Sequence, residues 1–248
     1  MELTAEQKGS LRSRGFVVLP AAVDPHRRDA ALRAINASLG AGLRPEDVLR
    51  FRARSFCPEL QDASVILDLF RGSAAQRAAA ALVGPAGLEA ARRAQIALAF
   101  PMAGSAESPP VPHIDGLYTP DNGVPEGTVA SFTMLAGVLL SDVTAPGAGN
   151  LLAWPGSHLT LERYFRERGP RALLDGMPPL DLGAPVPVLG RAGDVVLSHY
   201  QLAHAAGPNT SPHVRYAVYF RLKGRGHDAR RWDCLTDVWR EWPGLSAS

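Results

Sequence analysis

The pattern of hydrophobic and polar residues changes once along the chain. Residues 4–93 carry the signals of helices, with capping residues that stand directly before apolar or alanine-rich runs. Three helices are expected here: one over residues 4–14 with Thr4 as N-cap, one over residues 24–39 opened by Asp24-Pro25, and one over the alanine-rich residues 73–82.

From residue 94 onward the pattern is that of short strands. Apolar runs stop at prolines such as Pro101 and Pro155, and loops rich in glycine and proline separate them. This spacing favours a mainly β fold, the jelly-roll barrel or double-stranded β-helix of cupin-like proteins, with the N-terminal helices buttressing one sheet. The expected strands cover residues 95–100, 129–140, 151–154, 185–189, 194–198 and 214–222.

The chain is expected to form a single domain over residues 1–248, since β-barrel domains commonly reach this length. Within it, residues 1–93 would be helical support, residues 94–222 the barrel and residues 223–248 a C-terminal helical extension. Tryptophans in that extension are expected to pack against the core. Residues 103–112 form a loop just before the candidate site, where loops often gate access.

Composition and charge narrow the classes of function. A hydrophobic content of 46% suffices for a full core, and a net charge of +2 without a basic stripe argues against nucleic acid or a membrane surface as partner. Cys57 and Cys234 are too few for a disulfide framework. A polar N-terminus and the lack of eighteen consecutive apolar residues predict a cytoplasmic protein. Lys8 and Lys223 are the only lysines among 26 basic residues, which suggests a GC-rich, bacterial genome.

Two histidines and an aspartate carry the candidate chemistry. His113 and Asp115 are two positions apart, so at a strand end their side chains point the same way and can reach one ion. His204 must return from a distant strand. Two imidazoles and one carboxylate can occupy one face of a divalent iron and leave the other open for a bidentate cosubstrate and dioxygen. The plainer interpretation is a surface strand end for the first two residues and a core histidine for His204.

Arg215 is the candidate for binding a cosubstrate. It follows His204 by eleven positions, after a turn at Gly207-Pro208-Asn209, and strand alternation places it on one face with Ala217 and Tyr219. A guanidinium there could bind the far carboxylate of 2-oxoglutarate through two parallel hydrogen bonds. The alternative is an ordinary surface arginine.

Other polar residues lie near these motifs. Gln95 interrupts an apolar strand, so it could bind cosubstrate or substrate, or be a glutamine at a strand edge. Asn209 and Ser211 are expected to shape their turn through hydrogen bonds to the backbone. His199 and Tyr200 could lie behind the metal ligands and orient an imidazole.

This ordered set of motifs resembles the phytanoyl-CoA dioxygenase family of Fe(II)/2-oxoglutarate oxygenases. In that family a His-x-Asp, a distal His and an Arg eleven residues further form the iron and cosubstrate site. Segments around these residues are also similar to the family, and together the matches cover most of residues 3–222. These segments are the opening helix and strand over residues 3–19, Gly149-Asn150-Leu151 leading into Trp154-Pro155-Gly156-Ser157-His158, and Gly193-Asp194-Val195-Val196.

The resemblance implies an Fe(II)/2-oxoglutarate-dependent dioxygenase in which His113, Asp115 and His204 hold the metal and Arg215 binds 2-oxoglutarate. Relatives place a basic residue near the cosubstrate carboxylate in the region of Arg52 and Arg54, so Arg54 becomes a further candidate. The alternative is that both are solvated surface arginines. The implied reaction hydroxylates or otherwise oxidises a small organic molecule and releases succinate and CO2. A natural-product intermediate is the preferred substrate. Because Asp115 fills the third ligand position, hydroxylation or a related oxidation is expected rather than halogenation.

Two other functions fit the same residues. A non-oxidative cupin-like metalloenzyme would use the same ligands for a hydrolytic metal, and it would not bind 2-oxoglutarate. A non-catalytic barrel that binds a small molecule would retain no metal. Binding of metal and of 2-oxoglutarate therefore discriminates among the three.

Overall fold

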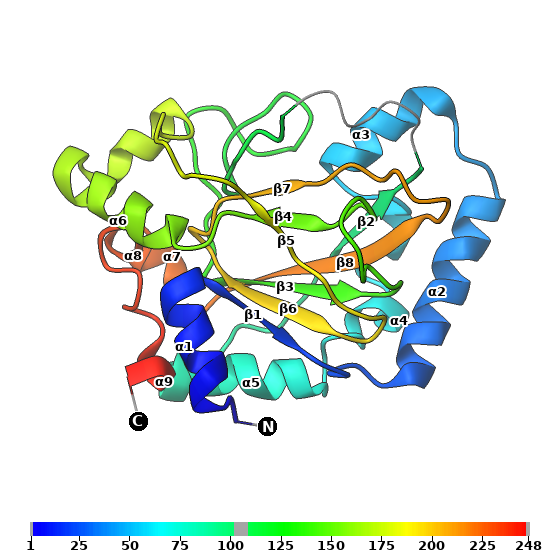
Figure 1. Cartoon of the computed structure of the whole chain (residues 1–248), viewed down its shortest axis with the longest axis horizontal. Helices are drawn as coiled ribbons and strands as arrows, with labels where there is room; N and C mark the ends of the chain where they lie inside the picture. Colours follow the sequence, from blue (N-terminus) through cyan, green and yellow to red (C-terminus); the bar gives the residue numbers. More distant parts are fainter. Residues whose placement is uncertain (1, 102–108, 247–248) are drawn as a thin grey trace.

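Two antiparallel β-sheets form the centre of the computed structural model, which describes residues 2–101 and 109–246 (Figure 1). The larger sheet has the strand order β1-β6-β3-β8-β2 and the smaller has the order β5-β4-β7. This arrangement confirms the expected mainly β, jelly-roll fold. The strands are β1 (Phe16–Leu19), β2 (Gln95–Ala99), β3 (Met134–Leu139), β4 (Leu151–Ala153), β5 (Val186–Pro187), β6 (Val195–His199), β7 (His204–Ala206) and β8 (Arg215–Leu222).

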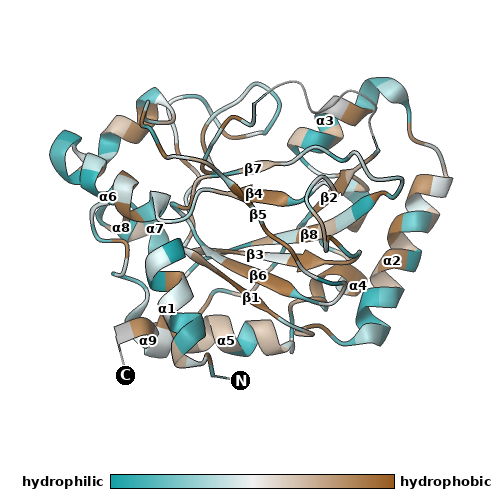
Figure 2. Ribbon diagram, in the orientation of Figure 1, coloured by the Kyte–Doolittle hydropathy of each residue, from teal (hydrophilic) through white to brown (hydrophobic). Residues whose placement is uncertain are grey.

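Helices from the first part of the chain cover the outer face of the larger sheet. A continuous apolar core joins Ile35 and Leu82 on these helices to Val218 and Phe220 on β8. Figure 2 shows hydrophobic colours along β3 and β6, and both hydrophobic and hydrophilic residues along α2. No helix in the described part of the chain is long and apolar enough to cross a membrane. The helices are α1 (Ala5–Arg14), α2 (Pro25–Gly40), α3 (Val48–Ala53), α4 (Ser64–Leu67), α5 (Ala74–Val83), α6 (Ser157–Arg168), α7 (His227–Arg230), α8 (Asp233–Thr236) and α9 (Pro243–Ser246).

Side-chain caps explain where the expected N-terminal helices begin. Thr4 accepts a hydrogen bond from the backbone of Gln7, whose side chain accepts one from Thr4 in return, and this capping box opens α1. Asp24 and Ser73 cap α2 and α5 with their side-chain oxygens, which accept hydrogen bonds from backbone N–H groups of the first helical turn. Each cap contributes about 1 kcal/mol to helix stability. The three helices expected from the sequence are therefore confirmed to within a residue or two.

The apolar run over residues 129–140 differs from the expected long strand, because β3 begins only at Met134. Val129 and Phe132 are buried instead in a separate apolar cluster with Leu161 and Phe165 of α6. Val129 and Phe132 are therefore apolar because they are buried in this cluster, and not because they pair as a strand. Of the loop expected over residues 103–112, residues 103–108 lie outside the described part of the chain.

Helix α6 was not predicted. It begins directly after Gly156, in the turn that follows β4, and ends before Gly169. Its buried residues include Leu161 and Phe165, which are four positions apart and so lie on one helical face. That spacing is the signal that could have identified the helix.

The segment after β8, residues 223–246, packs against the larger sheet through buried polar groups and tryptophans. The Glu241 carboxylate accepts a hydrogen bond from Thr133 at 2.6 Å and contacts His227 at 2.8 Å. Trp242 is buried, and its ring stacks on His199 with 5.3 Å between the centroids. The expected packing of C-terminal tryptophans against the core is confirmed for Trp242.

Two buried histidines in this region are expected to make folding stability depend on pH. Burial lowers the pKa of His158 from 6.5 to about 4. Burial and the nearby His158 lower the pKa of His199 from 6.5 to about 3. Below pH 6.5 the unfolded chain therefore binds more protons than the folded one, so stability is lost as the pH falls from about 6.5 towards 4. We expect a loss of about 1–2 kcal/mol per histidine at about pH 5.

Urea unfolding of the metal-free protein at about pH 7.5 and pH 5 would measure this loss. His158→Gln should reduce the difference between the two pH values, since one of the two groups no longer titrates. His26→Gln, which changes an exposed histidine on α2, is the matched control and should leave the difference unchanged. Equal differences in the wild type and His158→Gln would contradict the prediction.

Candidate functional site

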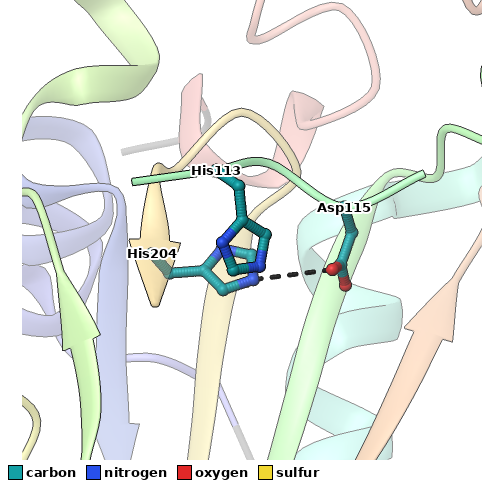
Figure 3. A group of neighbouring side chains, drawn as sticks. All are labelled: His113, Asp115 and His204. Carbon is teal, nitrogen blue, oxygen red and sulfur yellow. Dashed lines mark ion pairs between the residues drawn. The ribbon is translucent and has the colours of Figure 1, made fainter. Parts of the chain in front are cut away.

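His113, Asp115 and His204 converge beside the smaller sheet (Figure 3). His204 begins β7, and His113 lies opposite it in an antiparallel bridge with backbone hydrogen bonds of 3.1 and 2.9 Å. One nitrogen from each imidazole and one carboxylate oxygen lie within 4.8 Å of one another. The structure thus brings together the three residues that the sequence singled out.

The ring of His204 is held in one orientation. Its Nδ1 contacts the backbone carbonyl of Leu202 at 2.9 Å, which leaves Nε2 facing Asp115 Oδ1 at 3.7 Å. Two atoms at this separation can both reach an ion that lies about 2 Å from each. A backbone carbonyl behind a histidine ligand is a common way of fixing its tautomer.

The prediction that His199 or Tyr200 would orient an imidazole is wrong. The His199 ring contacts the Val238 carbonyl at 2.8 Å and accepts a hydrogen bond from the backbone of Gln201. The Tyr200 hydroxyl is buried and has no hydrogen-bond partner among the described residues. Both side chains serve the core behind the site, and the Leu202 carbonyl, which carries no side-chain signal in the sequence, takes the expected role.

Local charges and burial shift the pKa values of all three side chains, and for Asp115 and His113 they favour the form that binds a metal cation. Burial would raise the pKa of Asp115, but the Arg221 guanidinium and the contact with His204 outweigh it and hold that pKa well below its usual range. His113 is partly open to solvent, yet the surrounding protein and nearby His204 lower its pKa to about 4. For His204, the lowering effect of burial is outweighed by Asp115, which raises the pKa. An ionised carboxylate and a neutral His113 are the forms that bind a divalent metal.

Arg215 is buried at the start of β8, and no acidic side chain of the described residues pairs with it. Its Nε donates to the carbonyl of Gly149 at 2.8 Å and one terminal nitrogen donates to the carbonyl of Ala97 at 3.0 Å. A buried guanidinium without a counter-ion is costly. A carboxylate brought by a ligand would supply the missing charge.

Glycine at position 149 allows this close approach. Its backbone has φ +71°, and a Cβ there would lie 2.8 Å from the Cβ of Ala99 and 3.2 Å from that of Arg215. Neighbouring side chains on the same face of the larger sheet are small, because Ala99 is opposite Arg215 and Ala97 is opposite Ala217. No bulky neighbour in these pairs covers the guanidinium.

The turn before Arg215 is held as expected. The Asn209 side chain donates to the carbonyls of Ala99 at 2.8 Å and His213 at 2.7 Å, and its oxygen accepts hydrogen bonds from Ser211. These bonds fix the start of β8 against β2. The structural role predicted for Asn209 and Ser211 is confirmed.

Gln95 and Arg54 occupy different surroundings. Gln95 lies on β2, and its side-chain oxygen accepts a hydrogen bond from Arg221 of the neighbouring strand β8 at 2.8 Å. Arg221 in turn contacts Asp115, so Gln95 is linked to the His-Asp-His group. Arg54 is exposed and donates to the carbonyl of Asp121 at 2.6 Å. The structure does not bring Arg54 against this group, and its role and that of Gln95 remain predictions.

Arg221 is the residue of this group that the sequence analysis missed. It lies six positions after Arg215 on β8, and strand alternation places both on the same face. Continuing that alternation past Tyr219 would have pointed to it. Its partner Asp115 is far away in sequence, so the contact itself could not have been predicted from spacing.

Residues 11–217 match the family model of phytanoyl-CoA dioxygenase. The chain belongs to this family. Membership makes it a non-haem iron enzyme of the 2-oxoglutarate-dependent oxygenase type, with Fe(II) and 2-oxoglutarate as its metal and cosubstrate. The residues present fit both groups, since two imidazole nitrogens and a carboxylate oxygen converge and the buried Arg215 guanidinium has no counter-ion within the described part of the chain.

Several solved structures are similar to this one. The carbocyclase SnoK from nogalamycin biosynthesis, a non-haem α-ketoglutarate-dependent protein, is 25% identical, with a TM-score of 0.56 over 92% of this chain and 90% of SnoK. HygX from Streptomyces hygroscopicus, solved with nickel and 2-oxoglutarate bound, is 20% identical, with a TM-score of 0.59 over 91% and 89% of the two chains. The non-haem monooxygenase ThoJ is 22% identical, with a TM-score of 0.60 over 89% and 78%. The comparison with curated proteins gives no match.

Proposed function

We propose that this phytanoyl-CoA dioxygenase family member is an Fe(II)/2-oxoglutarate dioxygenase that hydroxylates, or otherwise oxidises, a small natural-product intermediate. The observation that carries the proposal is the combination of two features. Three ligand atoms from His113, Asp115 and His204 lie within 4.8 Å of one another, and buried Arg215 on the neighbouring sheet has no acidic partner among the described residues.

Each residue then has a separate task. His113, Asp115 and His204 hold the iron from one side and leave its other side open, and Arg215 binds the far carboxylate of 2-oxoglutarate. Bound iron supplies the oxidation of substrate by dioxygen, which is coupled to conversion of 2-oxoglutarate to succinate and CO2. The protein positions one substrate C–H bond and keeps water away from it.

Substrate would reach the metal from the side of His113. This residue is exposed, whereas His204 is buried and Asp115 is largely covered. Val111 and Tyr118, which flank the His-x-Asp motif, are exposed hydrophobic residues, at 78% and 44%. Exposed apolar side chains this close to the motif in sequence suit a small molecule with hydrophobic surface. The 25% identity to SnoK, an enzyme of nogalamycin biosynthesis, supports a natural-product substrate.

The binding test uses Fe(II) and 2-oxoglutarate under anaerobic conditions. We expect one equivalent of each to bind and a weak visible charge-transfer band to develop. Iron binding without 2-oxoglutarate binding would favour a non-oxidative metalloenzyme, and failure to retain any metal would favour a non-catalytic barrel. A screen of natural-product intermediates for stimulated succinate formation would then identify the substrate.

Oxygen insertion is expected in place of halogenation, because Asp115 occupies the ligand position that a halide would need. The measurement is product mass under ¹⁸O₂ in chloride buffer with a substrate found by the screen. One labelled oxygen in the product indicates hydroxylation, and a loss of two hydrogens indicates desaturation or ring closure. Chloride incorporation by the unmodified protein would contradict the proposed role of Asp115.

A further inference from the structure

Arg221 makes a set of contacts that have no role in the proposed reaction. Its Nε and one terminal nitrogen donate to Asp115 Oδ2 at 3.0 and 2.9 Å. The same terminal nitrogen donates to the side-chain oxygen of Gln95 at 2.8 Å. One guanidinium therefore connects β8 and β2 of the larger sheet with the carboxylate that follows His113 in sequence.

These contacts divide the two oxygens of Asp115 between different partners. Oδ2 accepts both hydrogen bonds from Arg221, while Oδ1 faces His204 Nε2 at 3.7 Å. A metal between the two histidines would therefore meet Oδ1, because the guanidinium already occupies the approach to Oδ2. Binding through one oxygen saves a position on the metal that a two-oxygen carboxylate would fill.

The surroundings favour a fixed arrangement over a mobile surface ion pair. The Asp115 side chain is 14% exposed and that of Arg221 is 40% exposed. The guanidinium carbon lies 6.0 Å from the centroid of the Phe132 ring, and Gln95 contacts the same group from β2. Exposed ion pairs contribute little because both side chains must be ordered. Here Asp115 is mostly buried and Arg221 is held on two sides, so less conformational freedom is lost when the two side chains pair.

We propose that Arg221 is a positioning residue that holds Asp115 as a one-oxygen ligand of the metal, with Gln95 supporting the guanidinium. The inference rests on the proposed metal site. It gives Gln95 a task different from direct binding of cosubstrate or substrate. Arg221 acts on the metal through Asp115, and its effect is therefore visible in metal binding before any substrate is present.

The test compares Arg221→Met with the wild type by anaerobic titration with Fe(II) and with Co(II). We expect metal affinity to fall about 10- to 100-fold, the usual effect of removing a group that orients a metal ligand. The visible spectrum of the Co(II) protein should also change, because a carboxylate released from Arg221 can turn and bind through both oxygens. Arg221→Lys keeps the charge but cannot contact Asp115 and Gln95 at once. Its metal affinity should therefore lie between those of the wild type and Arg221→Met.

Arg240→Met is the matched control. Arg240 has a similarly exposed side chain, at 43%, and an ion pair of 3.4 Å with Asp233. This control should leave the metal affinity and Co(II) spectrum unchanged. Gln95→Leu, which leaves Asp115 and Arg221 in place, should weaken metal binding less than Arg221→Met. Circular dichroism would establish that each variant is folded.

The outcomes separate this inference from the proposed function. Suppose that His204→Ala loses the metal while Arg221→Met and Arg221→Lys bind Co(II) with wild-type affinity and spectrum. The metal site would then stand, and the positioning role of Arg221 would be overturned. If His204→Ala instead binds metal as the wild type does, the proposed site fails, and this inference fails with it.

Discussion

Replacing His204 by alanine is expected to abolish turnover and most Fe(II) binding. The variant keeps only His113 and Asp115, and two protein ligands rarely hold iron in a catalytic geometry. His204 is buried and its ring is held in one orientation by the Leu202 carbonyl, so the variant loses a ligand that is already positioned for the metal. His113→Ala should have the same result for the same reason.

The measurement is iron content after anaerobic loading, together with succinate formation from 2-oxoglutarate, which can be followed without the native substrate. His213→Ala changes an exposed histidine in the turn before β8 and is the matched control. It should retain both iron and activity. Stoichiometric iron and unchanged succinate formation in folded His204→Ala would remove this residue from the site.

The class of fold could be predicted because short apolar runs that end at prolines indicate strands without any knowledge of their partners. The sequence alone could not predict which strands pair with each other. His204 and His113 meet through an antiparallel bridge between segments far apart in the chain, and nothing in the spacing of the two residues fixes that register. The family resemblance supplied the ordered set of residues, and the structure shows how the backbone brings three of them together.

Local periodicity also decided which site residues could be found. The step from His113 to Asp115 and the alternation from Arg215 to Arg221 are both visible in the sequence. The first step indicates a site because histidine and aspartate are typical metal ligands, whereas Arg221 resembles any arginine of a surface strand. The Leu202 carbonyl that orients His204 is a backbone group and has no sequence signal at all. Secondary contacts of this kind require coordinates.

Arg215→Ala is expected to weaken 2-oxoglutarate binding by about 2–5 kcal/mol, because a buried carboxylate of the cosubstrate would lose its bidentate partner. Metal binding should be nearly unchanged, since Arg215 contacts Gly149 and Ala97 and none of the proposed ligands. The 2-oxoglutarate affinity of Arg215→Lys should lie between those of the wild type and Arg215→Ala, because an ammonium keeps the charge and loses the planar pair of donors. Anaerobic calorimetry of the iron-loaded protein measures these affinities.

Protein stability provides an independent measurement of the same contact. A ligand that binds only the folded protein raises its melting temperature, so 2-oxoglutarate should stabilise the iron-loaded wild type and have little effect on Arg215→Ala at the same concentration. Without cosubstrate the variant loses two hydrogen bonds to backbone carbonyls but also a buried charge that has no acidic partner among the described residues, and these effects oppose each other. Arg54→Ala, on an exposed residue, should behave like the wild type in both experiments. If 2-oxoglutarate affinity instead falls in Arg54→Ala and is retained in Arg215→Ala, Arg54 is the anchor and the buried guanidinium has another purpose.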